Sequence, residues 1–359
     1  MKLFIYLVSL IIIGSAAYAF GPSLPQANRE SQIQPPFPNE NELILYTIPS
    51  PREISWDSPR KLVGSVLSNT ALAQHGKDGT HSIGHVFIGL NVNGRKLLAG
   101  MTSEGNAEGL EMVTQRGYGL GSMGADMHGK LQSSAELEAE VRVLCKDKGF
   151  GYLRYKLSPP LAQRLLTYFD EYCERGCDKH YGGFNRPRYG EGGGCSAFGV
   201  SFLDVAGLLE QEHREKWTVD VRIPEHLYGG PYTGKHVSLA HLAALGPLAH
   251  NWAKAKEAHV RCFMWEPTLM YRWIVKKRKE LQDVKEGPVS NEQAGCALGL
   301  VVDARGRAVP TEPIWKDPKR EPNPYGWHKG LHWARESEKQ TTEDEFAISF
   351  SGLNIFGDH

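Results

Sequence analysis

The chain has 359 residues, which is enough for one large domain or two modest ones. Its 41 basic and 41 acidic side chains balance, so charge gives no reason to expect a nucleic acid or a strongly charged surface as a partner. Hydrophobic residues make up 41% of the sequence and charged residues 23%, proportions that are typical of a globular protein.

The N-terminus has the pattern of a secretory signal peptide at 1–19. A lysine, an apolar run at 3–13 and small residues lead to an A-x-A cleavage pattern. A transmembrane anchor is the alternative, but the run is short for a membrane-spanning helix of about 20 residues. No later segment suits a membrane span, so we expect an exported protein, periplasmic or secreted, with no integral membrane span after cleavage. Residues 20–41, rich in Pro, Gln and Asn, are expected to form a flexible leader.

Hydrophobic periodicity, turn residues and helix caps divide the rest of the chain into elements. The clearest helix covers 158–176, because Ser158 can cap its start, prolines suit its first turn and Gly176 suits its end. Residues 135–148 fit a strand as well as a helix. The other expected elements are a strand at 42–50, a helix at 58–74, a hairpin at 81–102, a loop with short elements at 103–135, a helix from Cys195 onward, a strand and turn at 217–230, helices at 237–259 and 266–281, and a hairpin at 296–309.

The hairpin at 81–102 is expected to turn at Asn93-Gly94, the preferred pair for a two-residue turn. Counting outward from that turn places His85 opposite Thr102. Because side chains alternate along a strand, His81, Ile83, His85 and Phe87 are expected to share one face, barring a bulge at Gly84.

A run of three glycines leads directly into Cys195 and an apolar helix. The N–H groups at a helix N-terminus favour the thiolate, which is the nucleophilic form of cysteine. The same groups can bind the oxyanion of a tetrahedral intermediate, and the glycines let a substrate backbone approach the sulfur. Cys195 is therefore a candidate nucleophile, with Gly194 and Ser196 at the oxyanion position. The alternatives are a buried structural cysteine, and Ser196 as nucleophile, although Ser196 lacks the G-x-S-x-G pattern.

A cysteine nucleophile needs a histidine that accepts its proton and a polar group that orients the ring. His85 is the candidate base, because a strand holds its ring rigidly. Thr102, opposite it in the hairpin, is the expected orienting residue, and Glu104 is the alternative. Two other interpretations stay open: His85 as a structural histidine with a satisfied hydrogen bond, and a base downstream of Cys195, such as His236 in GKHVSL.

The segments GHVFIGL around His85 and GGGCSAFGVSFL around Cys195 resemble the circularly permuted NlpC/P60-like branch of the papain-like superfamily. Permuted members place the His-bearing strand before the Cys-bearing helix, which is the order in this chain. The resemblance implies an α+β fold with a papain-like core, in which antiparallel strands pack on the cysteine-bearing helix. It also implies that Cys195 is the nucleophile, His85 the base and Thr102 the third residue.

These inferences predict a catalytic domain at 42–230 and a helical, irregular C-terminal extension at 231–359. The expected activity is hydrolysis of an amide or peptide bond through an acyl-enzyme on Cys195. The compartment and the resemblance make cell-wall peptides (peptidoglycan) candidate substrates. An acyltransferase that uses the same Cys–His site is one alternative. The other is a non-catalytic secreted or envelope binding protein whose cysteines are structural.

No cofactor and no metal ion is expected. The spacing of His81 and His85 suits zinc on a helix, but the residues around them favour a strand, and no glutamate lies between them. Cys173, Cys177 and His180 offer half of a metal site, and a disulfide or two inert thiols is the more ordinary interpretation. Six cysteines favour disulfides in an exported chain, although a catalytic thiol would leave an odd number for pairing.

Overall fold

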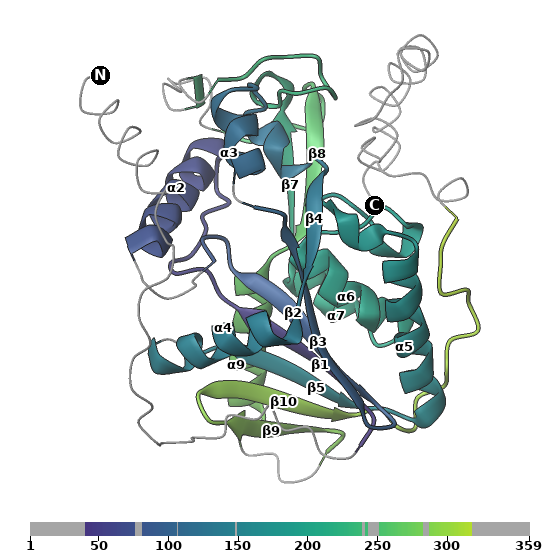
Figure 1. Ribbon diagram of the computed structural model, residues 1–359. Coiled ribbons are helices and arrows are strands. Elements are labelled where there is room, and N and C mark those ends of the chain that lie inside the picture. The colour runs from purple at the N-terminus through teal and green to yellow at the C-terminus, as the bar shows by residue number, and fades with distance from the viewer. Residues whose placement is uncertain are drawn as a thin grey trace, which may run out of the picture. The chain divides into compact units, whose positions relative to one another are not determined.

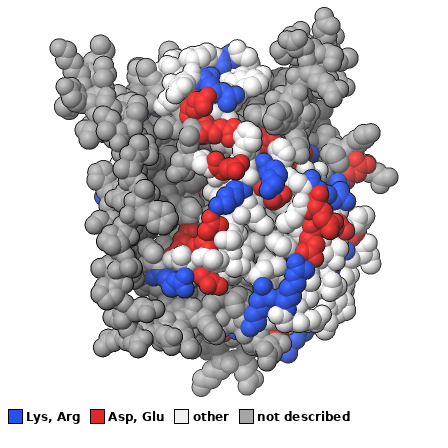
Figure 2. All heavy atoms as spheres, viewed as in Figure 1, with Lys and Arg blue, Asp and Glu red and all other residues white. Residues whose placement is uncertain are grey.

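The computed structural model describes residues 40–75, 81–105, 107–147, 149–238, 241–242, 251–282 and 287–317. The expected signal peptide, and the leader as far as residue 39, lie outside these ranges. Within them, no helix combines the length and the apolar character that crossing a bilayer requires. On the described part of the face in Figure 2, acidic and basic side chains are interspersed rather than gathered by sign.

A mixed sheet runs through the centre of the fold (Figure 1). In the described residues it has eight strands in the order β6-β4-β3-β2-β1-β5-β10-β9. Neighbouring strands are antiparallel except β5 and β10, which are parallel. A second, smaller sheet pairs β7 (Thr218–Pro224) with β8 (His259–Trp265). The strands of the large sheet are β1 (Glu42–Ile48), β2 (His85–Val92), β3 (Arg95–Ser103), β4 (Met127–Gln132), β5 (Gly151–Lys156), β6 (His180–Tyr181), β9 (Val289–Ala294) and β10 (Ala297–Asp303).

Helices cover both faces of this sheet, which makes the fold α+β, as expected at that level (Figure 1). They are α2 (Pro59–His75), α3 (Ala107–Thr114), α4 (Ser134–Asp147), α5 (Pro159–Glu174), α6 (Cys195–Val205), α7 (Gln211–Lys216) and α9 (Pro267–Glu280). Along β2, Val86 and Ile88 enter a core cluster with α5 and α6. Phe87, between them, packs with Leu137 and Leu144 of α4 on the opposite face.

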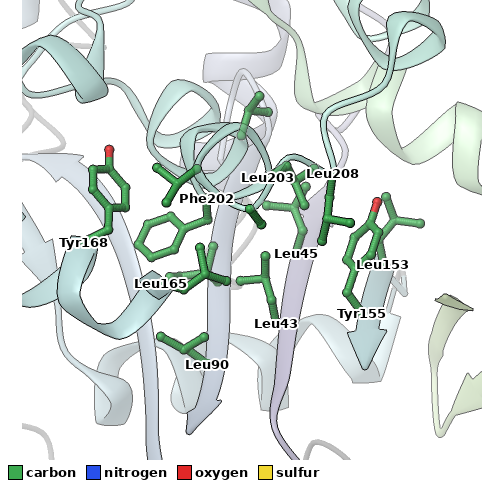
Figure 3. Close-up of a cluster of buried hydrophobic side chains, with 14 of the residues drawn as sticks. Leu43, Leu45, Leu90, Leu153, Tyr155, Leu165, Tyr168, Phe202, Leu203 and Leu208 are labelled. Carbon is green, nitrogen blue, oxygen red and sulfur yellow. The ribbon is translucent and has the colours of Figure 1, made fainter. Parts of the chain in front are cut away.

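The larger core cluster fills the space between the sheet and helices α5 and α6 (Figure 3). Leu43 and Leu45 of β1 lie in one cluster with Leu165 of α5 and Phe202 and Leu203 of α6. Full burial of such a side chain stabilises the fold by roughly 1.5–3 kcal/mol. This core therefore fixes the position of α6 against the sheet, and with it the position of the first residue of that helix.

The hairpin prediction is confirmed at its turn and wrong at its open end. Asn93 and Gly94 adopt positive φ angles of 50° and 87°, as a tight hairpin turn requires. The pairing of β2 with β3 stops at Ile88 and Ala99. Beyond that point β3 pairs with β4, so Thr102 lies opposite Lys130. The expected His85–Thr102 pair does not form, because β3 leaves β2 after Ala99 and continues beside β4.

Most elements predicted from local patterns are present, including the helices at 58–74, 158–176 and 266–281 and the helix that begins at Cys195. Ser158 is the N-cap residue of α5, but its side chain makes no capping hydrogen bond. The ambiguous segment 135–148 forms α4.

Three expectations are corrected. Residues 103–135 contain α3 and the sheet strand β4, where a loop with short elements was expected. The described part of 231–359 is not merely helical and irregular, because it supplies β8, β9 and β10. The late hairpin turns at Gly295-Cys296, earlier than the expected 296–309.

The helix expected at 237–259 does not include 251–258, which form turns and bends. Residues 239–240 and 243–250 of that expected helix lie outside the described residues.

One disulfide joins Cys145 of α4 to Cys296 in the turn between β9 and β10. The other cysteines of the described residues are not in disulfides: Cys173, Cys177, Cys195 and Cys262. Cys195 is therefore available as a thiol, whereas the interpretation as a binding protein expected it in a disulfide.

Candidate functional site

Cys195 is the first residue of α6, and main-chain hydrogen bonds hold the glycine run before it against β6. The N–H of Gly193 donates to the carbonyl of His180 at 3.1 Å, and the N–H of Gly194 donates to the carbonyl of Gly182 at 2.8 Å. Gly192 has a φ of 78°, and a Cβ at that position would lie 2.4 Å from the His180 carbonyl oxygen. Only glycine fits there, so the glycine run is what brings the thiol next to β6.

The thiol of Cys195 lies beside a half-buried tyrosine. The hydroxyl of Tyr181, on β6, accepts a hydrogen bond from the main-chain N–H of Cys195 and is also hydrogen-bonded to its side chain. Burial raises the pKa of Tyr181 well above its ordinary value, and the neighbouring thiol adds to that increase. Ser196 Oγ lies 3.8 Å from Cys195 Sγ, and both residues are 6% exposed. The hydroxyl oxygen of Tyr181 therefore already occupies the N-terminus of α6, next to the sulfur.

The residue before Tyr181 is a histidine that contacts a carboxylate from the residue that precedes β4. His180 Nδ1 is 3.0 Å from Asp126 Oδ2, and Asp126 is almost fully buried. The side-chain amide of Asn185 donates to the other oxygen of Asp126 at 2.9 Å and to the carbonyl of Glu191 at 2.8 Å. The carboxylate holds the proton on Nδ1 of His180, which leaves Nε2 as the basic nitrogen.

The structure separates Cys195 from His85, contrary to the expected pairing. Val86 points toward α6, since a Cβ at Gly199 of that helix would lie 2.7 Å from Val86 Cγ1. His85, the preceding residue on β2, points to the opposite face and stacks with Phe87 there. Because a sheet lies between them, the His85 ring cannot accept the proton of Cys195. The assignment of His85 as the base for this thiol is therefore wrong in this geometry.

The two orienting residues expected for His85 do not contact it either. Thr102 lies opposite Lys130 in the pairing of β3 with β4, and the N–H of Glu104 donates to the carbonyl of His128. The side chain that takes this role is Gln132 of β4, whose Oε1 is 2.7 Å from His85 Nε2.

His85 instead belongs to a polar cluster between the sheet and α4. Its ring stacks on that of His81, with ring centroids 4.1 Å apart. His81 Nε2 contacts Glu140 Oε1 of α4 at 2.5 Å, and Gln132 also hydrogen-bonds Glu140. One ligand atom from each of His81, His85 and Glu140 lies within 4.8 Å of the other two. We call His81, His85, Gln132 and Glu140 the His–Glu cluster.

The environment of the His–Glu cluster keeps its carboxylate charged. Burial alone would raise the pKa of Glu140, but hydrogen bonds and charge from His81, with help from His85 and Gln132, lower it. Burial lowers the pKa of His85, against the opposing effects of the Glu140 charge and the Gln132 hydrogen bond. A neutral imidazole beside a carboxylate is the combination found in metal-binding sites.

Other candidates from the sequence lie elsewhere. The ring of His236 packs against Gly117, since a Cβ added to that glycine would lie 2.2 Å from the ring. Burial, with the charge of Asp178, raises the pKa of the Cys173 thiol to about 11. Cys173 is therefore a thiol of low reactivity near neutral pH.

Sequence reasoning did not single out Tyr181, Asp126 or Glu140. His180 was weighed only as a metal ligand, because the two-residue strand that carries it has no pattern of its own. Glu140 lies in a segment that fits a strand as well as a helix, so its face could not be assigned. The signal that was available is the sequence HYGGFN, in which a histidine and an asparagine precede the glycine run.

Comparisons were made with protein-family models, with curated proteins and with solved structures. None of the three found a match to this chain.

Proposed function

We propose that this chain is an exported, thiol-dependent hydrolase of the papain-like kind, which cleaves an amide or peptide bond through an acyl-enzyme on Cys195. The observation that carries the proposal is the arrangement around the sulfur. The free thiol starts a buried helix, and the N–H of Cys195 is hydrogen-bonded to the Tyr181 hydroxyl oxygen. His180, the residue before Tyr181 on β6, is paired with Asp126.

In this proposal His180 replaces His85 as the general base, and its ring has to turn toward Cys195, because neighbouring side chains on a strand point to opposite faces and the side chain of Tyr181 is the one that contacts the thiol. Its Nε2 accepts the proton of Cys195, while Asp126 holds the ring through Nδ1 and stabilises the imidazolium that forms. The thiolate attacks the carbonyl carbon, and the bond to the leaving amine breaks as His180 returns the proton to that nitrogen. Water then attacks the thioester with His180 again as base, which frees the carboxylic acid and restores the thiol.

The helix N-terminus supplies the oxyanion site. The N–H of Cys195 already binds an oxygen, that of Tyr181, so a substrate carbonyl that displaced this hydroxyl would meet a donor aimed at it. Gly194 keeps the approach open and Ser196 lines it, which are the roles that the sequence suggested for them. Loss of one such donor in acyl-transfer enzymes costs about 100- to 1000-fold in turnover.

The substrate class rests on the export pattern and on the family resemblance. Both favour a peptide outside the cytoplasm, with peptidoglycan stem peptides as the first to test. The resemblance includes the order of the His-bearing strand and the Cys-bearing helix, and the packing of α6 on β2 and β3 fits it.

The test is alkylation of the folded mature protein with iodoacetamide across pH, with the modified cysteine identified by mass spectrometry. We expect Cys195 to label well below the free-thiol pKa of about 8.5. His180→Ala should shift this labelling to higher pH. His128→Ala is the matched control, because His128 lies opposite His180 in the strand pair and its side chain is exposed.

The outcomes separate the possibilities. If Cys195 stays inert until the protein is unfolded, the thiol hydrolase is excluded. If His85→Ala abolishes low-pH labelling and His180→Ala does not, the base assignment made here is wrong. Cys173 serves as an internal reference, because burial has raised its pKa to about 11.

A further inference from the structure

We propose that the His–Glu cluster is a binding site for a divalent transition-metal ion, with zinc as its natural occupant. His81, His85 and Glu140 would be the protein ligands. This site is on the α4 face of the sheet, apart from Cys195, so the inference does not depend on the thiol hydrolase. It revises the expectation that the chain binds no metal.

The geometry is close to that of a three-ligand site. The ligand atoms of His81, His85 and Glu140 lie within 4.8 Å of one another. Ligand atoms around tetrahedral zinc are roughly 3.3 Å apart, as bond lengths of about 2.0–2.1 Å require. His81 Nε2 and Glu140 Oε1 are 2.5 Å apart, so an ion needs them to separate by less than about 1 Å. An imidazole nitrogen binds a metal through a lone pair in the plane of its ring, so the stacked rings of His81 and His85 must also turn away from one another until both point at the ion.

The donor types select the metal. Two imidazoles and one carboxylate are the His₂Glu set of catalytic zinc sites, which leave the fourth position to water or a substrate atom. Calcium and magnesium prefer oxygen donors throughout, and this cluster offers only one carboxylate. The side chain of His81 is 27% exposed, which gives an ion a route in and leaves room for the fourth ligand.

The surroundings position the ligands before any ion arrives. Gln132 accepts from His85 and hydrogen-bonds Glu140, so it orients two ligands at once. A Cβ at Gly100 would lie 2.8 Å from Gln132 Oε1 and 3.2 Å from His85 Nε2, so glycine makes the space for this polar group. The disulfide at Cys145 ties α4, which carries Glu140, to the turn between β9 and β10.

The experiment is titration of the chelator-treated mature protein with Zn²⁺ by isothermal calorimetry, and with Co²⁺ by visible absorption. We expect one ion per chain and a higher melting temperature in saturating zinc. His81→Ala and Glu140→Ala should abolish saturable binding. Gln132→Ala should weaken it by about 10- to 100-fold, as the loss of an orienting partner does at other sites.

Two controls separate this site from adventitious binding. His128 also contacts a glutamate, Glu108, but this pair has no second histidine beside it among the described residues, unlike the proposed site. The variant His128→Ala should therefore bind zinc like the wild type. The double variant Cys173→Ser/Cys177→Ser should also bind normally. Circular dichroism without metal shows whether each variant is folded. His81 lies outside β2 and is partly exposed, so His81→Ala should fold even if a buried variant does not.

Either of two results would overturn the proposal. One is the absence of saturable zinc binding by the folded wild-type protein. The other is binding that persists in folded His81→Ala and Glu140→Ala but is lost in the double cysteine variant.

Discussion

Glu42 is a carboxylate with no exposed surface on the first strand of the central sheet. Arg154 donates to it through Nε at 2.6 Å and to Glu292 through Nη1 at 2.8 Å. One guanidinium thus serves two carboxylates, and Glu42 Oε1 has no hydrogen-bond partner among the described residues. Burial raises the pKa of Glu42 to about 7, although Arg154 acts in the opposite direction.

This carboxyl predicts a pH dependence of stability. The folded pKa of Glu42, about 7, lies above its ordinary value of 4.5, so the folded state binds the extra proton between these values. The contribution of Glu42 is therefore complete below pH 4.5 and is lost as pH rises through 7. We expect the free energy of unfolding to fall by about 2 kcal/mol over this range because of this one group. Urea denaturation from pH 5 to pH 8 measures it.

Glu42→Gln should remove that component and make stability less dependent on pH. Glu53→Gln is the matched control, because Glu53 is an exposed partner of Arg272 whose pKa is lowered by that contact. An unchanged pH profile in Glu42→Gln would show that the carboxyl is not the source.

For single residues, the sequence predicts that Cys195 starts a helix, but it does not predict which side chains lie beside the thiol. A glycine run followed by an apolar helix is a local pattern, and it places the thiol at the helix start correctly. The alternation of side chains places His81, His85 and Phe87 on one face, which the ring contacts confirm. It cannot tell which face α6 covers. Every residue of β2 is buried, so hydrophobicity does not distinguish the two sides.

Among the elements, α6 depends on a glycine in its middle. A Cβ at Gly199 would lie 2.7 Å from both Leu45 Cδ1 and Val86 Cγ1, which are side chains of the sheet beneath it. The helix can approach the sheet this closely only because that position has no side chain. Gly64 of α2 is the opposite case, since a Cβ there meets nothing within 4 Å.

These two glycines give a matched prediction. Gly199→Ala should lower the free energy of unfolding by about 1–3 kcal/mol, because the added methyl forces α6 away from a packed core. Gly64→Ala should raise it by about 0.5–1 kcal/mol through helix propensity alone. Chemical denaturation compares both with the wild type. Stabilisation by Gly199→Ala would contradict the close packing of α6 on β1 and β2.

The elements that the sequence missed have a common physical cause. β4 lies in a glycine-rich segment in which polar and apolar residues do not alternate. Most of its residues are exposed or only half-buried, so the strand has no continuous apolar face. β6 has two residues, too few for any period. β9 is a polar edge strand. The sequence predicts a hairpin within 296–309, whereas the first part of that segment forms β10 and pairs with β9. Local sequence patterns predict the helices and strands that bury one face and expose the other. They fail for strands such as β4, β6 and β9, which form only because another strand lies beside them in the fold.

Across the whole molecule, the Cys145–Cys296 disulfide closes a loop between residues that are 151 positions apart. It links α4 to the β9–β10 turn, so it constrains the helix on one face of the large sheet and the strand pair at one edge. By the loop-entropy argument, a closed loop of this length should stabilise the fold by about 3–5 kcal/mol.

Cys145→Ser/Cys296→Ser should therefore lower the melting temperature markedly in calorimetry. The same double variant should bind zinc more weakly, because α4 carries Glu140. Cys262→Ser, which changes a buried free cysteine, controls for the loss of a thiol group alone. A double variant as stable as the wild type would show that the disulfide is not needed to hold α4 in place.

The parallel pairing of β10 with β5 also determines when the large sheet can be completed as the chain is synthesised and folds. Strands β1 to β5 can pair as soon as residues up to 156 are available, but the free edge of β5 must wait for residues 297–303. During that interval β5 offers unpaired main-chain groups that any other strand can bind. A polypeptide that stops short of β10, through early termination or cleavage, would keep this edge open and tend to self-associate. In the finished molecule β10 covers this edge, and the polar strand β9 becomes the outer strand on that side of the sheet.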